Sequence, residues 1–172
     1  MTHHQNNEIK FCPYCGTPTQ KKIVYEKVRV FCPDCNWVYY EDPKVAAAVL
    51  VQQNGSILLA RRIFNPNKGE WTLPAGFIDA HEDPEQAAIR ECLEETGLEV
   101  NISGLREIIS GREHDRGADM VIVYDAEIIG GILTAGDDAD EVAFFPLDQL
   151  PPIAFQATRK VIKSLIQKNN PS

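Results

Sequence analysis

The chain has 172 residues, of which 44% are hydrophobic and 24% are charged, and its formal net charge is −8 at pH 7. This length fits one ordinary domain with a small additional module, and the composition is typical of a folded protein. The acidic balance argues against a protein whose main task is to coat nucleic acid. No apolar run reaches the roughly 18 residues of a membrane span, and no basic segment leads an apolar one as in a signal peptide. We therefore expect a cytoplasmic protein with no membrane partner.

Four of the five cysteines form two pairs, CPYC and CPDC, with sixteen residues between the pairs. They are Cys12, Cys15, Cys32 and Cys35. This spacing is typical of a four-thiolate Zn²⁺ site. A redox dithiol is the alternative, but two repeated pairs favour one shared ion, and without a secretory signal disulfides are less expected still.

The sequence therefore predicts a small zinc ribbon over residues 9–40. A segment of this size cannot bury a sufficient core alone, so the structural Zn²⁺ would supply much of the folding free energy. We interpret the ribbon as a brace for the fold because a closed four-thiolate site has no open position for chemistry. Nucleic-acid binding is the alternative.

The remaining residues, 41–172, have the pattern of one domain with mixed α and β structure. A strand is predicted over 44–52, followed by a hairpin turn at Asn54-Gly55 and a second strand over 56–62. Further strand candidates lie at 98–110 and 118–129. A helical period occurs only at 84–97 and again, after Pro152, at 153–168. Strands with two well-separated helices predict a mixed sheet between helices, an α/β/α sandwich.

The first predicted helix carries three glutamates on one face. Since a helix turns about 100° per residue, Glu91, Glu94 and Glu95 share one arc. The opposite, apolar arc is expected to be buried, leaving the acidic face free, and consists of Ile89, Cys92, Leu93 and Thr96. Clustered carboxylates repel one another without a cation, and hard oxygen ligands suit Mg²⁺ or Mn²⁺. A solvated acidic face is the alternative.

The stretch from Gly76 to Leu98, GFIDAHEDPEQAAIRECLEETGL, fits the pattern G-x(5)-E-x(7)-R-E-U-x-E-E-x-G-U at every fixed position, where U is apolar. It resembles the Nudix box. The resemblance implies a Nudix α/β/α sandwich and attack of a metal-activated water on a pyrophosphate. It also implies that Glu91 and Glu95 bind Mg²⁺ or Mn²⁺, that Glu94 supports them, and that Arg90 holds the loop and helix glutamates in place.

The same resemblance implies site residues outside the box. Glu141, just before the apolar segment of residues 142–147, would complete the metal site or act as the general base, with Glu94 as the other candidate base. Three neighbouring aspartates compete with it for this role, and they are Asp137, Asp138 and Asp140. The carbonyl of Ala75 would bind the metal, and Phe77 would contact the ligand.

A ribbon directly ahead of a Nudix box resembles the NADH pyrophosphatase branch and related FAD and ADP-ribose pyrophosphatases. This implies a homodimer with Tyr40 in the nucleotide pocket, although Tyr40 and Phe77 could equally be core aromatics. Residues 110–118, SGREHDRGA, depart from the motif of the NADH branch. They offer three cations suited to phosphates or a ribose, namely Arg112, His114 and Arg116. A solvated loop would look the same.

The expected function is therefore divalent-metal-dependent hydrolysis of a pyrophosphate bond. The substrate would be a small nucleoside diphosphate conjugate such as ADP-ribose, FAD or NADH, and one product a nucleoside monophosphate. One alternative is a non-catalytic sensor that uses the ribbon to contact nucleic acid or protein, but the complete set of glutamates argues against it. A second alternative is removal of an NAD cap from RNA, with the basic ribbon holding the RNA.

Overall fold

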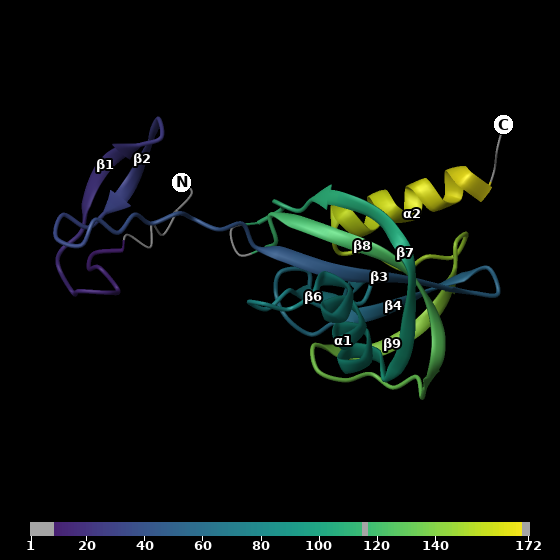
Figure 1. Ribbon diagram of the computed structural model, residues 1–172. Helices are drawn as coiled ribbons and strands as arrows, with labels where there is room; N and C mark the ends of the chain where they lie inside the picture. The colour runs from purple at the N-terminus through teal and green to yellow at the C-terminus, as the bar shows by residue number, and fades with distance from the viewer. Residues whose placement is uncertain (1–8, 115–116, 170–172) are drawn as a thin grey trace. The chain divides into compact units, whose positions relative to one another are not determined.

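The computed structural model describes residues 9–114 and 117–169 (Figure 1). The chain divides into two compact units, with the boundary between Asp42 and Pro43. Each unit is described by itself below.

The first unit contains one antiparallel hairpin, formed by β1 (Gln20–Val24) and β2 (Lys27–Phe31). The two turn residues, Tyr25 and Glu26, both have positive φ angles of 49° and 62°, as in the turns that match the twist of paired strands. Among the described residues of this unit, only Cys12 and Cys32 are buried. The buried interior of the described part of this unit therefore consists of cysteines and not of a hydrophobic core.

The second unit is built on a seven-stranded mixed sheet with the order β5-β4-β3-β8-β7, to which β6 adds by pairing with β3 and β9 by pairing with β4. Its strands are β3 (Val45–Gln53), β4 (Ser56–Arg62), β5 (Trp71–Thr72), β6 (Ala75–Phe77), β7 (Leu98–Ser110), β8 (Met120–Gly131) and β9 (Ala139–Pro146). The β3–β8 pairing is parallel, whereas β3 pairs with β4 and β6 in antiparallel fashion. The predicted mixed sheet is confirmed.

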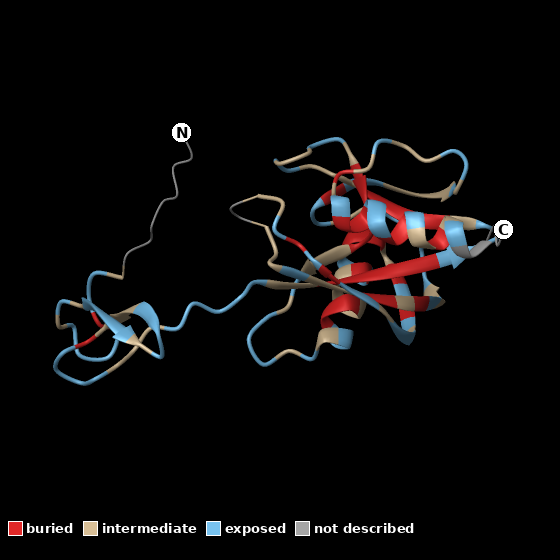
Figure 2. Cartoon of the chain, turned by 90° about the horizontal axis from the view of Figure 1, so that it is seen from above, coloured by how far each residue is buried: buried red, intermediate tan, exposed pale blue. Residues whose placement is uncertain are grey.

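Two helices, α1 (Pro84–Thr96) and α2 (Gln156–Asn169), lie on opposite sides of this sheet (Figure 1). The alternation of β3 shows why: Ala48 and Leu50 belong to the hydrophobic cluster beneath α2, whereas Val49 and Val51 belong to the cluster beneath α1. Buried residues accordingly occupy the strands and the inner sides of both helices (Figure 2). The predicted α/β/α sandwich is confirmed. Neither of these helices is long and apolar enough to cross a membrane.

The local signals for the first hairpin and the first helix hold in the structure. Asn54 and Gly55 turn the chain from β3 to β4 with φ angles of 51° and 78°. Asp83 caps α1 by accepting hydrogen bonds from the backbone N–H groups of the first turn, and Gly97 ends the helix in the left-handed conformation at φ 68°.

The buried face of α1 differs from the predicted one. Leu93 is 46% exposed, whereas Glu95 is only 7% exposed. The helix packs on the sheet through Ala88, Cys92 and Thr96. Glu95 lies beside these residues and is buried with them, whereas Leu93 faces solvent. The expectation that the acidic face stays free was therefore wrong for Glu95.

The second helix begins at Gln156, three residues later than predicted. Ile153 forms a parallel bridge with Trp71, and the backbone of Trp71 donates to Pro152 at 2.9 Å and accepts from Ala154 at 2.8 Å. These residues extend the sheet rather than the helix. Glu141 likewise lies inside β9 and not ahead of it.

Candidate active site and metal centres

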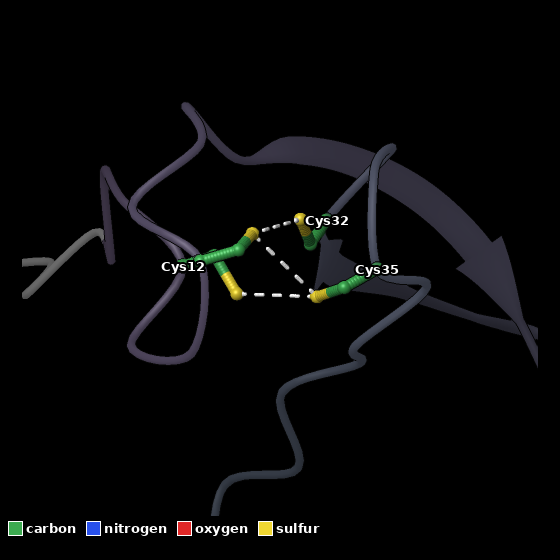
Figure 3. A group of neighbouring side chains, drawn as sticks. Cys12, Cys32 and Cys35 are labelled. Carbon is green, nitrogen blue, oxygen red and sulfur yellow. Dashed lines mark hydrogen bonds between the residues drawn. The ribbon is translucent and has the colours of Figure 1, made fainter.

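The four cysteines of the first unit come together at one point (Figure 3). Their Sγ atoms all lie within 4.8 Å of one another, and Cys12–Cys35 and Cys15–Cys32 are 3.5 and 3.4 Å apart. A disulfide needs about 2.05 Å, so these are separate thiols. Tetrahedral Zn²⁺ with Zn–S bonds of about 2.3 Å places its sulfurs about 3.8 Å apart. The cluster therefore fits a structural zinc ion.

Tight backbone turns orient these thiols. Directly after the first pair, the N–H of Gly16 donates to the carbonyl of Cys12 at 2.9 Å, and directly after the second pair the N–H of Asn36 donates to the carbonyl of Cys32 at 3.1 Å. Gly16 and Asn36 adopt positive φ angles of 72° and 60°. The two halves of the site thus repeat one local geometry, as their repeated sequence predicts.

In the second unit, Glu95 is the most deeply buried of the box glutamates. One carboxylate oxygen accepts a hydrogen bond from the backbone N–H of Ala75 at 3.1 Å. Burial raises the pKa of Glu95 to about 8, and the neighbouring charges of Glu91 and Asp138 act in the same direction. A buried carboxylate with this pKa is suited to binding a cation that replaces its proton.

Glu91 lies against the backbone of Gly76. A Cβ atom at position 76 would lie 2.1 Å from the Glu91 carboxyl carbon, so this close approach requires glycine. Burial also raises the pKa of Glu91, against the opposing influence of Arg90. Glu91 and Glu95 thus both line one side of β6.

Arg90 connects the helix to the loop ahead of it. Its guanidinium donates to both carboxylate oxygens of Glu82 at 2.7 and 2.9 Å, to Glu91 at 2.7 Å, to Glu94 at 3.1 Å and to the carbonyl of Phe77 at 3.1 Å. The Arg90 hydrogen bonds hold the pKa of Glu82 at about 2. Arg90 therefore contacts the residues that the resemblance assigned to it.

The other two proposed acidic residues are more accessible. The Glu94 side chain is 44% exposed and the Glu141 side chain is 49% exposed. Glu141 forms an ion pair of 2.5 Å with Arg61, its register partner on β4, and Arg61 also contacts Asp140 at 2.8 Å. Glu141 is thus directed toward Arg61.

Among residues 9–114 and 117–169, the cysteine cluster is the one group of three or more His, Cys, Asp or Glu side chains whose ligand atoms come together. The carboxylates of the second unit instead contact Arg90, Arg61 and the backbone of Ala75. Their donor chemistry still fits a divalent cation, since Glu91 and Glu95 are both desolvated oxygen ligands with raised pKa values. Asp137 and Asp138 add negative charge beside them.

A pocket of about 490 Å³ lies on the other side of β6. Its walls are mostly apolar and come from β3, β6, β8, α2 and the loops around Pro66 and His114. Polar side chains reach it from Arg62, Asn65, Thr72, Glu113, His114 and Thr158. This size and lining are typical of a small-molecule site.

The residues predicted to bind substrate do not all line this pocket. Phe77 lines the pocket and is 48% exposed, so it is not a core residue. Tyr40, 47% exposed, belongs to the first unit, where its ring lies 4.9 Å from the Arg29 guanidinium. Arg112 forms an ion pair with Asp119 at 2.6 Å and is not among the pocket-lining residues. Arg116 lies outside the described residues.

Sequence reasoning missed several pocket residues, among them Arg62 and Phe155. Arg62 stands at the end of β4 and its guanidinium lies 4.7 Å from the Phe155 ring centre. Burial lowers the pKa of Arg62, while the charges of Glu95 and Asp138 raise it. The position of Arg62 at the end of an apolar strand was the signal by which the sequence could have indicated it. No local pattern in the sequence indicated Phe155.

The sandwich fold, the glutamates of α1 and the arginine that joins them to the preceding loop define a Nudix domain. The family described as NUDIX domain matches residues 42–165, and the zinc-ribbon family described as Nudix N-terminal matches residues 10–41. The chain belongs to the Nudix hydrolases, as predicted.

Several known proteins are similar to this chain. An ADP-ribose pyrophosphatase of Methanocaldococcus jannaschii is 41% identical over 132 residues, covering 76% of this chain and 78% of that protein. An NAD-capped RNA hydrolase NudC of Pseudomonas aeruginosa is 34% identical over 160 residues, or 91% of this chain and 54% of NudC, so the chain spans about half of that relative. A NUDIX hydrolase structure from Nitrosomonas europaea superposes with a TM-score of 0.83 at 28% identity, covering 94% of this chain and 93% of that one.

Proposed function

We propose that the protein hydrolyses the pyrophosphate bond of a nucleoside diphosphate conjugate, with ADP-ribose as the first candidate substrate. One observation carries the proposal: β6 is shared by the pocket and the acidic helix. Ala75, Gly76 and Phe77 line the pocket, while the same three residues contact Glu95, Glu91 and Arg90. A ligand in the pocket therefore lies next to the carboxylates that suit a cation.

The pocket lining supports a nucleotide as the ligand. Its apolar walls and the exposed Phe77 ring suit a base, and Arg62 offers a planar guanidinium for phosphate. The 41% identity to an ADP-ribose pyrophosphatase, covering about three quarters of each protein, favours ADP-ribose among the conjugates.

In the proposed mechanism, Glu91, Glu95 and the Ala75 carbonyl would hold Mg²⁺ or Mn²⁺, with Glu141 as a further ligand. The metal, when bound, neutralises phosphate charge and lowers the pKa of an attacking water. Arg90 keeps Glu91 and the Glu82 loop in position.

Glu94 or Glu141 accepts the proton of the attacking water in this mechanism. Both are partly exposed, so either can pass the proton to solvent. Turnover of the variants Glu94→Gln and Glu141→Gln distinguishes the two, because the variant that lacks the base should lose the more turnover.

The test is product analysis with ADP-ribose, FAD, NADH and NAD⁺, each with Mg²⁺ or Mn²⁺. We expect AMP from ADP-ribose, dependent on the added metal, and far slower AMP release from the Glu95→Gln variant. Binding without turnover across the whole panel would overturn the proposal and favour a ligand sensor.

A second candidate is removal of an NAD cap from RNA, which the identity to NudC and one feature of the ribbon favour. Lys22 and Arg29 are register partners on one face of the β1–β2 hairpin, and two like charges in this position repel each other. Each lies over an aromatic ring, Lys22 over Phe31 at 4.4 Å and Arg29 over Tyr40 at 4.9 Å. Cations interleaved with aromatics suit single-stranded RNA.

Substitution of both cations separates the two candidates. If capped RNA is the substrate, Lys22→Glu with Arg29→Glu should reduce kcat/KM for NAD-capped RNA, more strongly at low salt, and leave kcat/KM for free NADH and ADP-ribose unchanged. Equal rates on capped RNA for wild type and variant would remove the support that the ribbon gives to this candidate.

A further inference from the structure

Helix α2 begins without a capping side chain of its own. Phe155 occupies the N-cap position, since its carbonyl accepts the first helical hydrogen bond from the N–H of Arg159 at 3.0 Å. A phenyl ring cannot accept hydrogen bonds from the first-turn N–H groups, which normally need such a partner. The first turn also contains no acidic residue.

The missing cap comes from Glu113, more than forty residues earlier in the chain. Its two carboxylate oxygens accept hydrogen bonds from the N–H groups of Gln156 at 2.9 Å and Ala157 at 3.0 Å. A negative charge at this end of a helix is also favoured by the helix dipole. The segment that follows β7 is therefore attached to α2 through one side chain.

This arrangement leaves the Phe155 ring available to the pocket. The ring lies 4.7 Å from the Arg62 guanidinium, and the His114 ring stacks on it with a centroid distance of 6.2 Å and an interplanar angle of 28°. Arg62, Glu113, His114 and Phe155 all line the pocket. A serine or aspartate at position 155 would cap the helix locally but would remove the ring.

Two glycines allow the same segment to pack closely. A Cβ at Gly111 would lie 2.3 Å from the carbonyl oxygen of Ala118, and a Cβ at Gly117 would lie 2.9 Å from the His114 ring. The N–H of Gly111 also donates to Asp119 at 3.0 Å. The described part of this wall is therefore fixed at its base by backbone contacts and at α2 by Glu113.

We infer that Glu113 is a positioning residue of the substrate pocket: by capping α2 it holds His114 against Phe155 and so sets the shape of the wall that the substrate meets. The inference rests on the proposed function, since it assumes that the substrate occupies this pocket. Glu113 is on the pocket side of β6, away from the acidic helix, so its loss affects substrate binding more than the chemical step.

The test compares Glu113→Ala and Glu113→Gln with Glu107→Ala, an exposed glutamate on β7 that serves as the matched control. With ADP-ribose, Glu113→Ala should raise KM roughly fivefold to tenfold and change kcat less than twofold, because one lost cap corresponds to roughly this factor. Glu113→Gln keeps one acceptor oxygen and should lie between Ala and wild type. The control should match wild type.

Amide hydrogen exchange supplies a readout that is independent of turnover. Faster exchange at residues 111–114 and 117–118 in Glu113→Ala, together with the KM rise, supports the inference. A lowered Tm with wild-type KM and wild-type exchange at these residues would overturn it, leaving a purely structural cap. If wild type hydrolyses none of ADP-ribose, FAD, NADH and NAD⁺, the proposed function fails; Glu113 is then tested by this exchange and by the affinity for AMP, both of which must change in Glu113→Ala for the inference to stand.

Discussion

The backbone N–H of Ala75 donates a hydrogen bond of 3.1 Å to the carboxylate of Glu95, and this contact joins β6 to α1 where the protein buries an acidic side chain. We expect Glu95→Gln to lower turnover roughly 100-fold or more, since the amide is a poor metal ligand. The amide oxygen can still accept from Ala75, so the fold should be kept. Circular dichroism and AMP release measure the two effects, and wild-type turnover in this variant would contradict the site.

Glu95 also makes the stability of the metal-free protein depend on pH. Its pKa is about 8 in the folded protein and about 4.5 in an unfolded chain, so between these values the folded state keeps a proton that the unfolded state has lost. Stability should therefore fall as pH rises from about 5 to 8.

The difference between wild type and Glu95→Gln reports mainly this effect, because groups distant from Glu95 titrate alike in both proteins. The measurement is urea unfolding without Mg²⁺ or Mn²⁺ and with zinc retained. The free energy of unfolding of Glu95→Gln, relative to that of wild type, should rise by on the order of 3 kcal/mol between pH 5 and 9. A difference that stays constant across this range would mean that Glu95 is ionised in the folded protein.

Gly76→Ala should displace Glu91 without unfolding the chain, because a Cβ at this position meets the Glu91 carboxyl group. We expect roughly a 100-fold loss of turnover, as for other small displacements of catalytic groups. Gly104→Ala is the matched control, since a Cβ at Gly104 meets nothing within 4 Å. Steady-state kinetics of both variants with Mg²⁺ provide the comparison, and equal activity would show that the position of Glu91 does not matter.

Arg90→Lys should not preserve the Arg90 contacts, because one ammonium cannot reach Glu82, Glu91 and the Phe77 carbonyl together. We expect a 10- to 100-fold loss of activity and a loss of stability of about 1–2 kcal/mol. Urea denaturation and kinetics check the two effects. Lys160→Arg, the reverse exchange at an exposed position on α2, should have neither effect.

Zinc removal should loosen residues 11–40 and leave the second unit folded. Only Cys12 and Cys32 are buried among the described residues of the first unit, so little else holds it together. Hydrogen exchange after chelation should increase across β1 and β2 and remain unchanged in β3 and β8. Protection of β1 and β2 without zinc would show that the ribbon folds without metal.

The sequence was sufficient for features that depend on neighbouring residues. Asn54-Gly55, Pro84 and Gly97 define a turn and two helix ends through their own backbone preferences, and the structure has all three. The repeated cysteine pairs likewise predicted one cluster, and the structure forms it.

Features that depend on contacts between distant segments could not be predicted from the sequence. The burial of Glu95 results from a strand twenty positions earlier, and helical periodicity alone assigned the buried side to Leu93. Ile153 fits the helical period of α2, but in the structure it pairs with Trp71 at the edge of the sheet. The role of Phe155 depends on Glu113, which no pattern within α2 reveals.

The shared cap also affects how substrate preference can change over evolution or in the laboratory. Because Glu113 caps a helix and also lines the pocket, we expect a substitution there to change ligand choice and thermal stability together. Variation at Phe155 is coupled in the same way, since a polar residue would make Glu113 redundant while emptying part of the pocket. Libraries that vary both positions at once should therefore reach specificities that libraries varying either position alone do not.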